Sequence, residues 1–151
     1  MRSRKIGPHI YFLELRTAGD GLEAAIREIR LVGESGGGRV FRGDEKMFLR
    51  SFLKFCTDVD IFVTWGGESF ALPLLTAKII RNRLDPAPLY ETYHLDLKTF
   101  FEKTFSASVS DVSEAAALLG LRKRRDALEN MRAVFNALRS ILRVTRPELA
   151  L

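Results

Sequence analysis

Hydrophobic residues recur with two different spacings along the chain. Residues 10–15, 25–32 and 39–42 are short apolar or alternating segments, a pattern that indicates β-strands. Glycine-rich stretches separate them, at residues 19–21 and 33–38, and such stretches favour turns. We therefore expect the chain to begin with an antiparallel meander of three strands.

After this meander, helical spacing alternates with single short apolar runs. Asp44 suits the N-cap of a helix over 45–57, because apolar residues recur there every three or four positions. Residues 61–65 indicate a strand of the kind that is buried in a parallel sheet. The same reasoning predicts a helix over 70–82 capped by Ser69, followed by a loop over 85–88. A strand over 93–97 then leads into a helix that ends at Phe105. Two further helices are expected, one over 112–119 that is capped by Ser110 or Asp111 and ended by Gly120, and a long one over 124–144. The order predicts an α/β fold with a mixed central sheet flanked by helices.

Length and composition narrow the class of protein. The 151 residues suit a single domain over 1–151, and 46% hydrophobic residues supply a packed core, which excludes a disordered chain. The single cysteine, Cys56, lies in an apolar helical pattern, so we expect a small buried side chain in a reducing compartment rather than a reactive thiol. No apolar run approaches the length of a membrane span or of a signal-peptide core. We expect a cytoplasmic protein that does not contact membranes.

Positive charge is concentrated near the carboxyl end. The formal net charge is +5, and residues 122–151 alone carry eight basic and three acidic side chains. Arg122, Lys123, Arg124 and Arg125 are consecutive. This cluster predicts a basic surface that suits a phosphate backbone, and the alternative is an ordinary solvated helix face.

Three stretches of the chain lie at intervals that match the three motifs of one enzyme family. Residues 12–19, FLELRTAG, resemble the first motif, F-L-D-I-E-T-T-G. Residues 58–73, DVDIFVTWGGESFALP, are similar to the second motif of family B polymerase proofreading domains and their stand-alone relatives, D-I-I-V-x-Y-N-G-x-S-F-D-L-P. Residues 125–133, RDALENMRA, resemble the third, H-x-A-L-x-D-A-x-A or Y-x-x-x-D, and residues 94–97, HLDL, resemble the H-x-D-L segment of those relatives. In these motifs the chain resembles the DEDD 3′–5′ exonucleases, a family of the ribonuclease H-like superfamily. The resemblance spans most of the chain and implies a ribonuclease H-like fold.

The resemblance also shows which functional residues are changed. The four acidic metal-ligand positions of the family correspond to Glu14, Arg16, Ala71 and Asn130, so one carboxylate remains. Two hard divalent ions need carboxylate oxygens both as ligands and as neutralising charge. Arg16 would place a fixed cation there, and two like charges about 4 Å apart cost roughly 4 kcal/mol at an effective dielectric of 20. We expect no intact catalytic site and no cofactor, with Mg²⁺ or Mn²⁺ at Glu14 only if nuclease activity is retained.

Other acids offer a weak alternative to the missing ligands. The position of the family's general base holds Arg125 or Asp126, depending on the pattern used. The acids that could move toward the site are Glu68, Asp96, Asp126 and Glu129. A site rebuilt from them would still have to tolerate Arg16. The two histidines, His9 and His94, are too few and too far apart in sequence to predict a zinc site.

Three functions remain open. The first is a catalytically degenerate module of DNA replication or repair that binds single-stranded DNA or RNA. Its predicted nucleic-acid contacts are Arg16, Arg122, Lys123, Arg124, Arg125 and Trp65. The Trp65 ring could stack on a base, or it could belong to the core. The second is a scaffold that docks on a protein such as a polymerase or helicase, with Arg16 in a buried ion pair with Glu14. The third is a residual metal-dependent exonuclease.

Overall fold

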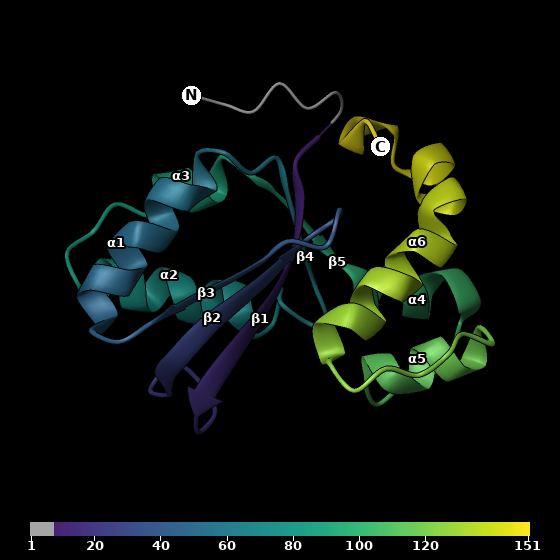
Figure 1. The fold of residues 1–151 in the computed structure, drawn as a ribbon, viewed down its shortest axis with the longest axis horizontal. Helices are drawn as coiled ribbons and strands as arrows, with labels where there is room; N and C mark the ends of the chain where they lie inside the picture. The colour runs from purple at the N-terminus through teal and green to yellow at the C-terminus, as the bar shows by residue number, and fades with distance from the viewer. Residues whose placement is uncertain (1–7) are drawn as a thin grey trace.

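Five strands form the central sheet of the computed structural model, which describes residues 8–151. The strands are β1 (Ile10–Ala18), β2 (Ala25–Gly33), β3 (Gly38–Arg42), β4 (Ile61–Thr64) and β5 (Tyr93–Asp96). Their spatial order is β3-β2-β1-β4-β5 (Figure 1). β1, β2 and β3 pair antiparallel, and β4 and β5 continue the sheet parallel to β1. The mixed α/β sheet expected from the sequence is confirmed.

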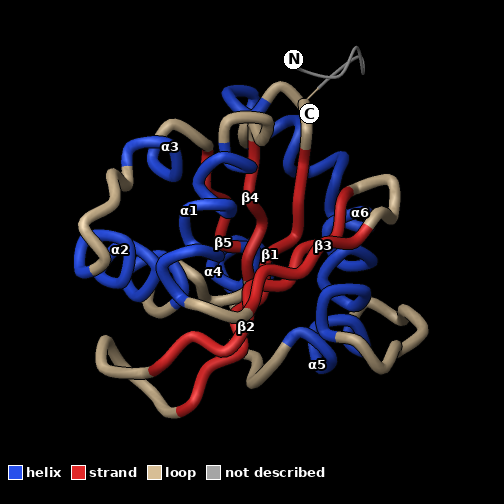
Figure 2. Tube along the Cα trace, turned by 60° about the vertical axis from the view of Figure 1, so that its left-hand side comes forward, coloured by secondary structure: helices blue, strands red, loops and turns tan. Residues whose placement is uncertain are grey.

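Helices cover both faces of this sheet (Figures 1 and 2). They are α1 (Glu45–Cys56), α2 (Ala71–Arg81), α3 (Ala87–Tyr90), α4 (Leu97–Phe105), α5 (Val112–Leu118), α6 (Ala127–Thr145) and the 3₁₀ helix η1 (Pro147–Leu149). α1, α2 and α3 lie on one side of the sheet, and α4, α5 and α6 lie on the other (Figure 1). Within residues 8–151, none of these helices combines the length and the apolar character that crossing a membrane requires.

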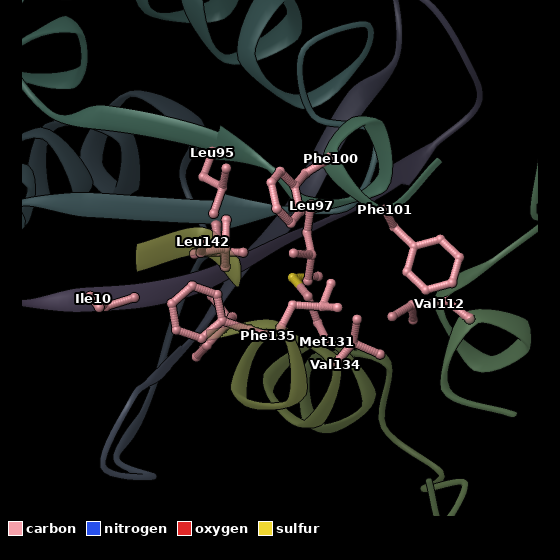
Figure 3. Packing of buried hydrophobic residues seen from close by; sticks show 14 of the residues in the cluster. Ile10, Leu95, Leu97, Phe100, Phe101, Val112, Met131, Val134, Phe135 and Leu142 are labelled. Carbon is pink, nitrogen blue, oxygen red and sulfur yellow. The ribbon is translucent and has the colours of Figure 1, made fainter. Parts of the chain in front are cut away.

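The long helix α6 closes one of the two apolar layers. Its inner stripe packs with residues of the sheet and of α4, and Figure 3 shows this cluster from close by. The ring of Phe12 in β1 meets the ring of Phe135 edge to face, with centroids 5.3 Å apart. The α6 side chains in the cluster include Met131, Val134, Phe135 and Leu142. This stripe follows the helical periodicity of the sequence, which explains why the helix was predictable.

The second layer lies between the sheet and α1 and α2. Phe52 of α1 and Phe62 of β4 pack with ring centroids 5.8 Å apart, among buried residues that include Leu13 and Leu74. Cys56 belongs to this layer, and burial raises the pKa of its thiol to about 12. The expectation of a buried cysteine is confirmed, and a thiol with this pKa stays protonated at neutral pH.

Three local predictions were wrong. α6 begins at Ala127 rather than at residue 124, because Asp126 is the N-cap and accepts a hydrogen bond from the Leu128 N–H. Ser69 does not cap α2, since its hydroxyl donates to the Gly66 carbonyl instead. The expected loop over 85–88 contains the start of the short helix α3. The first difference matters most, because it moves Arg124 and Arg125 from the helix into the loop that already held Arg122 and Lys123.

Candidate functional site

A cleft opens where the carboxyl ends of β1 and β4 meet the amino ends of α2, α5 and α6. Its volume is about 230 Å³. It is lined by Leu13, Glu14, Leu15, Thr64, Trp65, Gly66, Gly67, Phe70, Ala71, Asp111, Val112, Ala127 and Met131. The carboxyl ends of parallel strands are the usual place for ligands in open α/β sheets. Of the residues singled out in the motifs, Glu14, Trp65 and Ala71 therefore share one cleft.

Asp96 fixes the rim of this cleft. Its buried carboxylate accepts backbone N–H groups from Gly66 at 2.8 Å and from Glu68 at 3.2 Å. It also caps α4 by accepting the N–H groups of Lys98 and Thr99. These contacts hold the turn after β4 against the start of α4. Asp96 is thus a structural carboxylate with both oxygens engaged, not a spare metal ligand.

Gly67 allows that turn to lie directly on Thr64. A β-carbon at residue 67 would come within 2.6 Å of the Thr64 Cβ and 2.8 Å of its Cγ2. We expect Gly67→Ala to lower the free energy of unfolding by about 1–3 kcal/mol, as overpacking does. Urea denaturation measures the change, with Gly37→Ala as the control, because a β-carbon there meets nothing within 4 Å. Equal small losses in both variants would contradict this packing.

His94 is expected to make the stability of the fold depend on pH, next to Thr64 of the cleft wall. Its Nε2 lies 2.6 Å from the Thr64 hydroxyl, and burial lowers the pKa of the imidazole although Asp96 and Glu68 oppose this effect. The native state therefore favours the neutral ring, whereas the unfolded chain takes up a proton below about pH 6.5. We expect the free energy of unfolding to fall between pH 7.5 and 5.5.

The fall should be smaller in His94→Gln, which removes the titrating ring. His9→Gln is the matched control, because it removes the other histidine and leaves His94 in place. Urea titrations at the two pH values provide the comparison. A fall of the same size in His94→Gln and in the unmodified protein would show that His94 does not cause it.

A network of charges, which we call the β1–β2 charge cluster, borders the cleft: Glu14, Arg16, Glu28, Arg30 and Asp126. In the register of the two strands Glu14 lies opposite Arg30, and Arg16 lies opposite Glu28. Arg30 Nη1 is 2.8 Å from Glu14 Oε1, and Arg30 Nη2 is 3.0 Å from Asp126 Oδ2. The hydrogen bond from Arg30 holds the pKa of the Asp126 carboxyl below its usual range. Arg30 therefore pairs with both acids, Glu14 and Asp126, and stabilises the ionised form of Asp126.

Sequence reasoning missed Arg30. It lies in none of the three motifs, and its partners are 16 and 96 positions away in the chain. The one available signal was the alternation of Glu28 and Arg30 on the second strand, which mirrors Glu14 and Arg16 on the first. That signal becomes useful only once the register of the hairpin is known.

The Arg16 side chain is more exposed than a buried ion pair with Glu14 would require. Its Nε lies 3.7 Å from Glu14 Oε1 and 3.7 Å from Glu28 Oε1, and the side chain is 58% exposed. The ion pair with Glu14 is present, but the expectation that it is buried was wrong. Arg16 lies in the part of β1 that pairs with β2 but not with β4. A long, weakly held guanidinium of this kind remains available to another anion.

Asn130 faces the backbone of Arg124, and it is not among the residues that line the cleft. The residue is 3% exposed, its Oδ1 accepts from the Arg124 N–H at 2.8 Å, and its Nδ2 donates to the Arg124 carbonyl at 2.8 Å. Both polar groups of the Asn130 side chain therefore bind the backbone of Arg124. Ala71, at another of the former ligand positions, contributes only a methyl group to the cleft wall.

Arg122, Lys123, Arg124 and Arg125 form an exposed loop just before α6, which we call the basic loop. Asn130 fixes its backbone, and the Arg124 guanidinium donates to the Arg122 carbonyl. Ala127, two residues after the loop, lines the cleft. The basic loop thus projects from one edge of the cleft with its charges toward solvent.

Trp65 belongs partly to the core and partly to the cleft wall. Its ring lies 6.2 Å from that of Phe101, between centroids, while the residue also lines the cleft. Within residues 8–151, its indole Nε1 is buried and has no hydrogen-bond partner. A buried donor without a partner is uncommon.

The donor set does not fit the pair of divalent ions that the resemblance implies. Glu68 is exposed, and Glu129 pairs with Arg132 at 3.3 Å. Glu14 and Asp126 are both held by Arg30. In the part of the chain that the structure describes, no three residues among His, Cys, Asp and Glu come together as a metal site.

Solved structures of exonucleases share this arrangement of elements. An ExoI/SSB-Ct complex matches 95% of this chain with a TM-score of 0.73 at 12% identity. Escherichia coli exonuclease I in complex with a dA16 oligonucleotide matches 94% with a TM-score of 0.72 at 13% identity. The family B DNA polymerase of the archaeon Pyrobaculum calidifontis matches 89% with a TM-score of 0.66 at 14% identity. This chain has the ribonuclease H-like exonuclease fold.

The likeness is one of fold and extends over part of each relative. The match covers 42% of each of the two exonuclease I chains and 24% of the polymerase chain. No protein-family model and no curated protein matches the sequence. The fold expected from the motifs is confirmed, whereas the chemistry has to be inferred from the residues of this chain.

Proposed function

We propose that this chain is a single domain, residues 1–151, that binds single-stranded nucleic acid and does not cleave it. The observation that carries the proposal is the exposed basic loop at the edge of an aromatic-walled cleft that lacks the donors for a metal pair. Positive charge beside aromatic side chains is the usual composition of a single-strand binding surface.

The basic loop supplies affinity for the phosphate backbone. An exposed guanidinium can bind a phosphate through two parallel hydrogen bonds. Asn130 already holds the backbone of this loop in place, so little conformational freedom is lost when the loop binds. Arg16, exposed beside Glu14, offers a further cation near the cleft.

The cleft supplies a place for a base. Trp65 and Phe70 belong to its wall, and Leu13 and Met131 make it largely apolar. The Trp65 ring in this wall offers an aromatic surface on which a base could stack. A strand that follows the basic loop could therefore place one base in the cleft.

A role as an accessory module in DNA replication or repair in the cytoplasm is part of the same proposal. It is supported by fold likeness to exonuclease I in complex with dA16, to an ExoI/SSB-Ct complex and to a family B DNA polymerase. We therefore take single-stranded DNA as the first ligand to test. RNA and a protein partner such as a polymerase or helicase stay as predictions of the sequence.

Fluorescence anisotropy of a labelled single-stranded oligothymidylate tests the proposal. The titration is done in EDTA at about 20 mM salt, where phosphate contacts are strongest. We expect saturable binding, and an apparent Kd that rises steeply with salt. A blunt duplex of the same length is the control and should bind more weakly. Absence of binding to the single strand would overturn the proposal and favour the protein scaffold.

A further inference from the structure

We propose that the Arg30 guanidinium takes the place of a divalent cation between Glu14 and Asp126, so that this cleft is built to work without metal. The inference rests on the proposed function for its biological meaning, since it explains how the cleft can hold a strand in metal-free form. Its test measures metal binding in the absence of nucleic acid. The two proposals can therefore fail separately.

Three elements bring carboxylates to Arg30. Glu14 comes from β1, Glu28 comes from β2 and Asp126 is the N-cap of α6. The distances from Arg30 nitrogens are 2.8 Å to Glu14 Oε1, 3.0 Å to Asp126 Oδ2 and 3.8 Å to Glu28 Oε1. Three acids of different origin thus surround one guanidinium. Arg16 is the only other cation that pairs with them among the ion pairs of residues 8–151.

The chemistry of the two cations makes them alternatives at this place. Carboxylate oxygens are the preferred ligands of hard divalent ions. A guanidinium also binds carboxylates, through a fork of N–H donors, and it keeps its charge at any pH at which the protein is folded. Arg30 has a donor on Glu14 and two on Asp126. A divalent ion would have to displace this side chain or bind beside its positive charge.

The exposure of the cluster explains why Arg30 competes well with an ion. The side chains of Arg30, Glu14, Glu28 and Asp126 are 21%, 25%, 19% and 33% exposed, so all four are partly covered. The cover of the surrounding sheet and α6 strengthens charge interactions relative to bulk water. A tethered cation also loses less freedom on pairing than an ion taken from solution. Removing Arg30 leaves three facing carboxylates, and a divalent ion would then relieve their repulsion.

The experiment replaces Arg30 by threonine, which suits a strand and leaves space between the acids. Mn²⁺ binding is measured by electron paramagnetic resonance of the free ion and by calorimetry, without nucleic acid. We expect Arg30→Thr to bind Mn²⁺ at least tenfold more tightly than the unmodified protein. The double variant Arg30→Thr/Glu14→Gln should lose this gain. Arg27→Thr is the matched control, because it removes an exposed arginine from the same strand, β2, and Arg27 makes no ion pair with these three acids among residues 8–151.

Two results would overturn the inference. The first is tight Mn²⁺ binding by the unmodified protein that Glu14→Gln abolishes, because the site would then already hold a metal. The second is a folded Arg30→Thr variant that binds Mn²⁺ no better than Arg27→Thr.

The inference remains testable if Arg30→Thr does not fold. Nuclear magnetic resonance of the unmodified protein then reports whether Mn²⁺ broadens the signals of Glu14 and Asp126. No selective broadening is expected, and selective broadening at these two residues would overturn the inference.

Discussion

Replacing Arg122, Lys123 and Arg125 by glutamine is expected to weaken single-strand binding at low salt by roughly a hundredfold. Three phosphate contacts are lost, and each charge on a single strand contributes about 0.7 to the slope of log affinity against log salt. The slope should therefore decrease by about 2. Arg124 is left in place because Asn130 holds its backbone and its guanidinium contacts Arg122. The measurement is the anisotropy titration repeated at several salt concentrations.

A matched variant separates this local effect from net charge. Lys46, Arg50 and Lys54 lie exposed on α1, which covers the opposite face of the sheet from α6. Their replacement by glutamine removes the same amount of charge from a surface away from the cleft. We expect at most a few-fold loss of affinity. Equal losses in the two triple variants would mean that binding depends on overall charge and not on the basic loop.

Asn130→Asp is expected to destabilise the domain by about 2–4 kcal/mol, although it restores an acid at a position where the exonuclease motif has one. The new carboxylate could still accept the Arg124 N–H. It could not donate to the Arg124 carbonyl, so two acceptors would face each other in a buried site. Leaving such groups unpaired costs more when one of them is charged. Chemical denaturation at pH 7 gives the change in the free energy of unfolding.

The control for this variant is on the same helix. Asn136 lies on the exposed side of α6, and Asn136→Asp makes the same chemical change in solvent. Its effect should stay within about 0.5 kcal/mol, as is usual for surface substitutions. If Asn130→Asp were instead as stable as the control and gained affinity for Mn²⁺, the residue would have to be regarded as a metal-ligand position after all.

Much of the fold could be predicted because local signals and tertiary packing agree. Asp44 precedes an amphipathic run, and it caps α1 as expected. The apolar residues of 61–65 match the buried strand β4. The start of α6 could not be placed, because Arg124 and Asp126 are both acceptable near a helix start and only the cap hydrogen bond decides between them.

The site was predictable where it follows a motif and not where it depends on register. Glu14, Trp65 and Ala71 line one cleft, as the positions of their motifs indicate. Arg30 acquires its role from lying opposite Glu14 across a hairpin and from the approach of Asp126, which no local pattern encodes. Asn130 was assigned to the vestigial metal site, yet its side chain supports the basic loop. Residues in motifs could be located, but their partners could not.

One experiment tests the central claim, that this cleft holds a single strand without metal and leaves it intact. Labelled single-stranded DNA is incubated with the protein in EDTA and, in parallel, in Mn²⁺, and each sample is divided between an anisotropy reading and a denaturing gel. With the ionic strength of the two samples matched, we predict apparent Kd values that agree within a few-fold, and a full-length strand on both gels. Shortened products that appear in Mn²⁺ and disappear in Glu14→Ala would contradict the account.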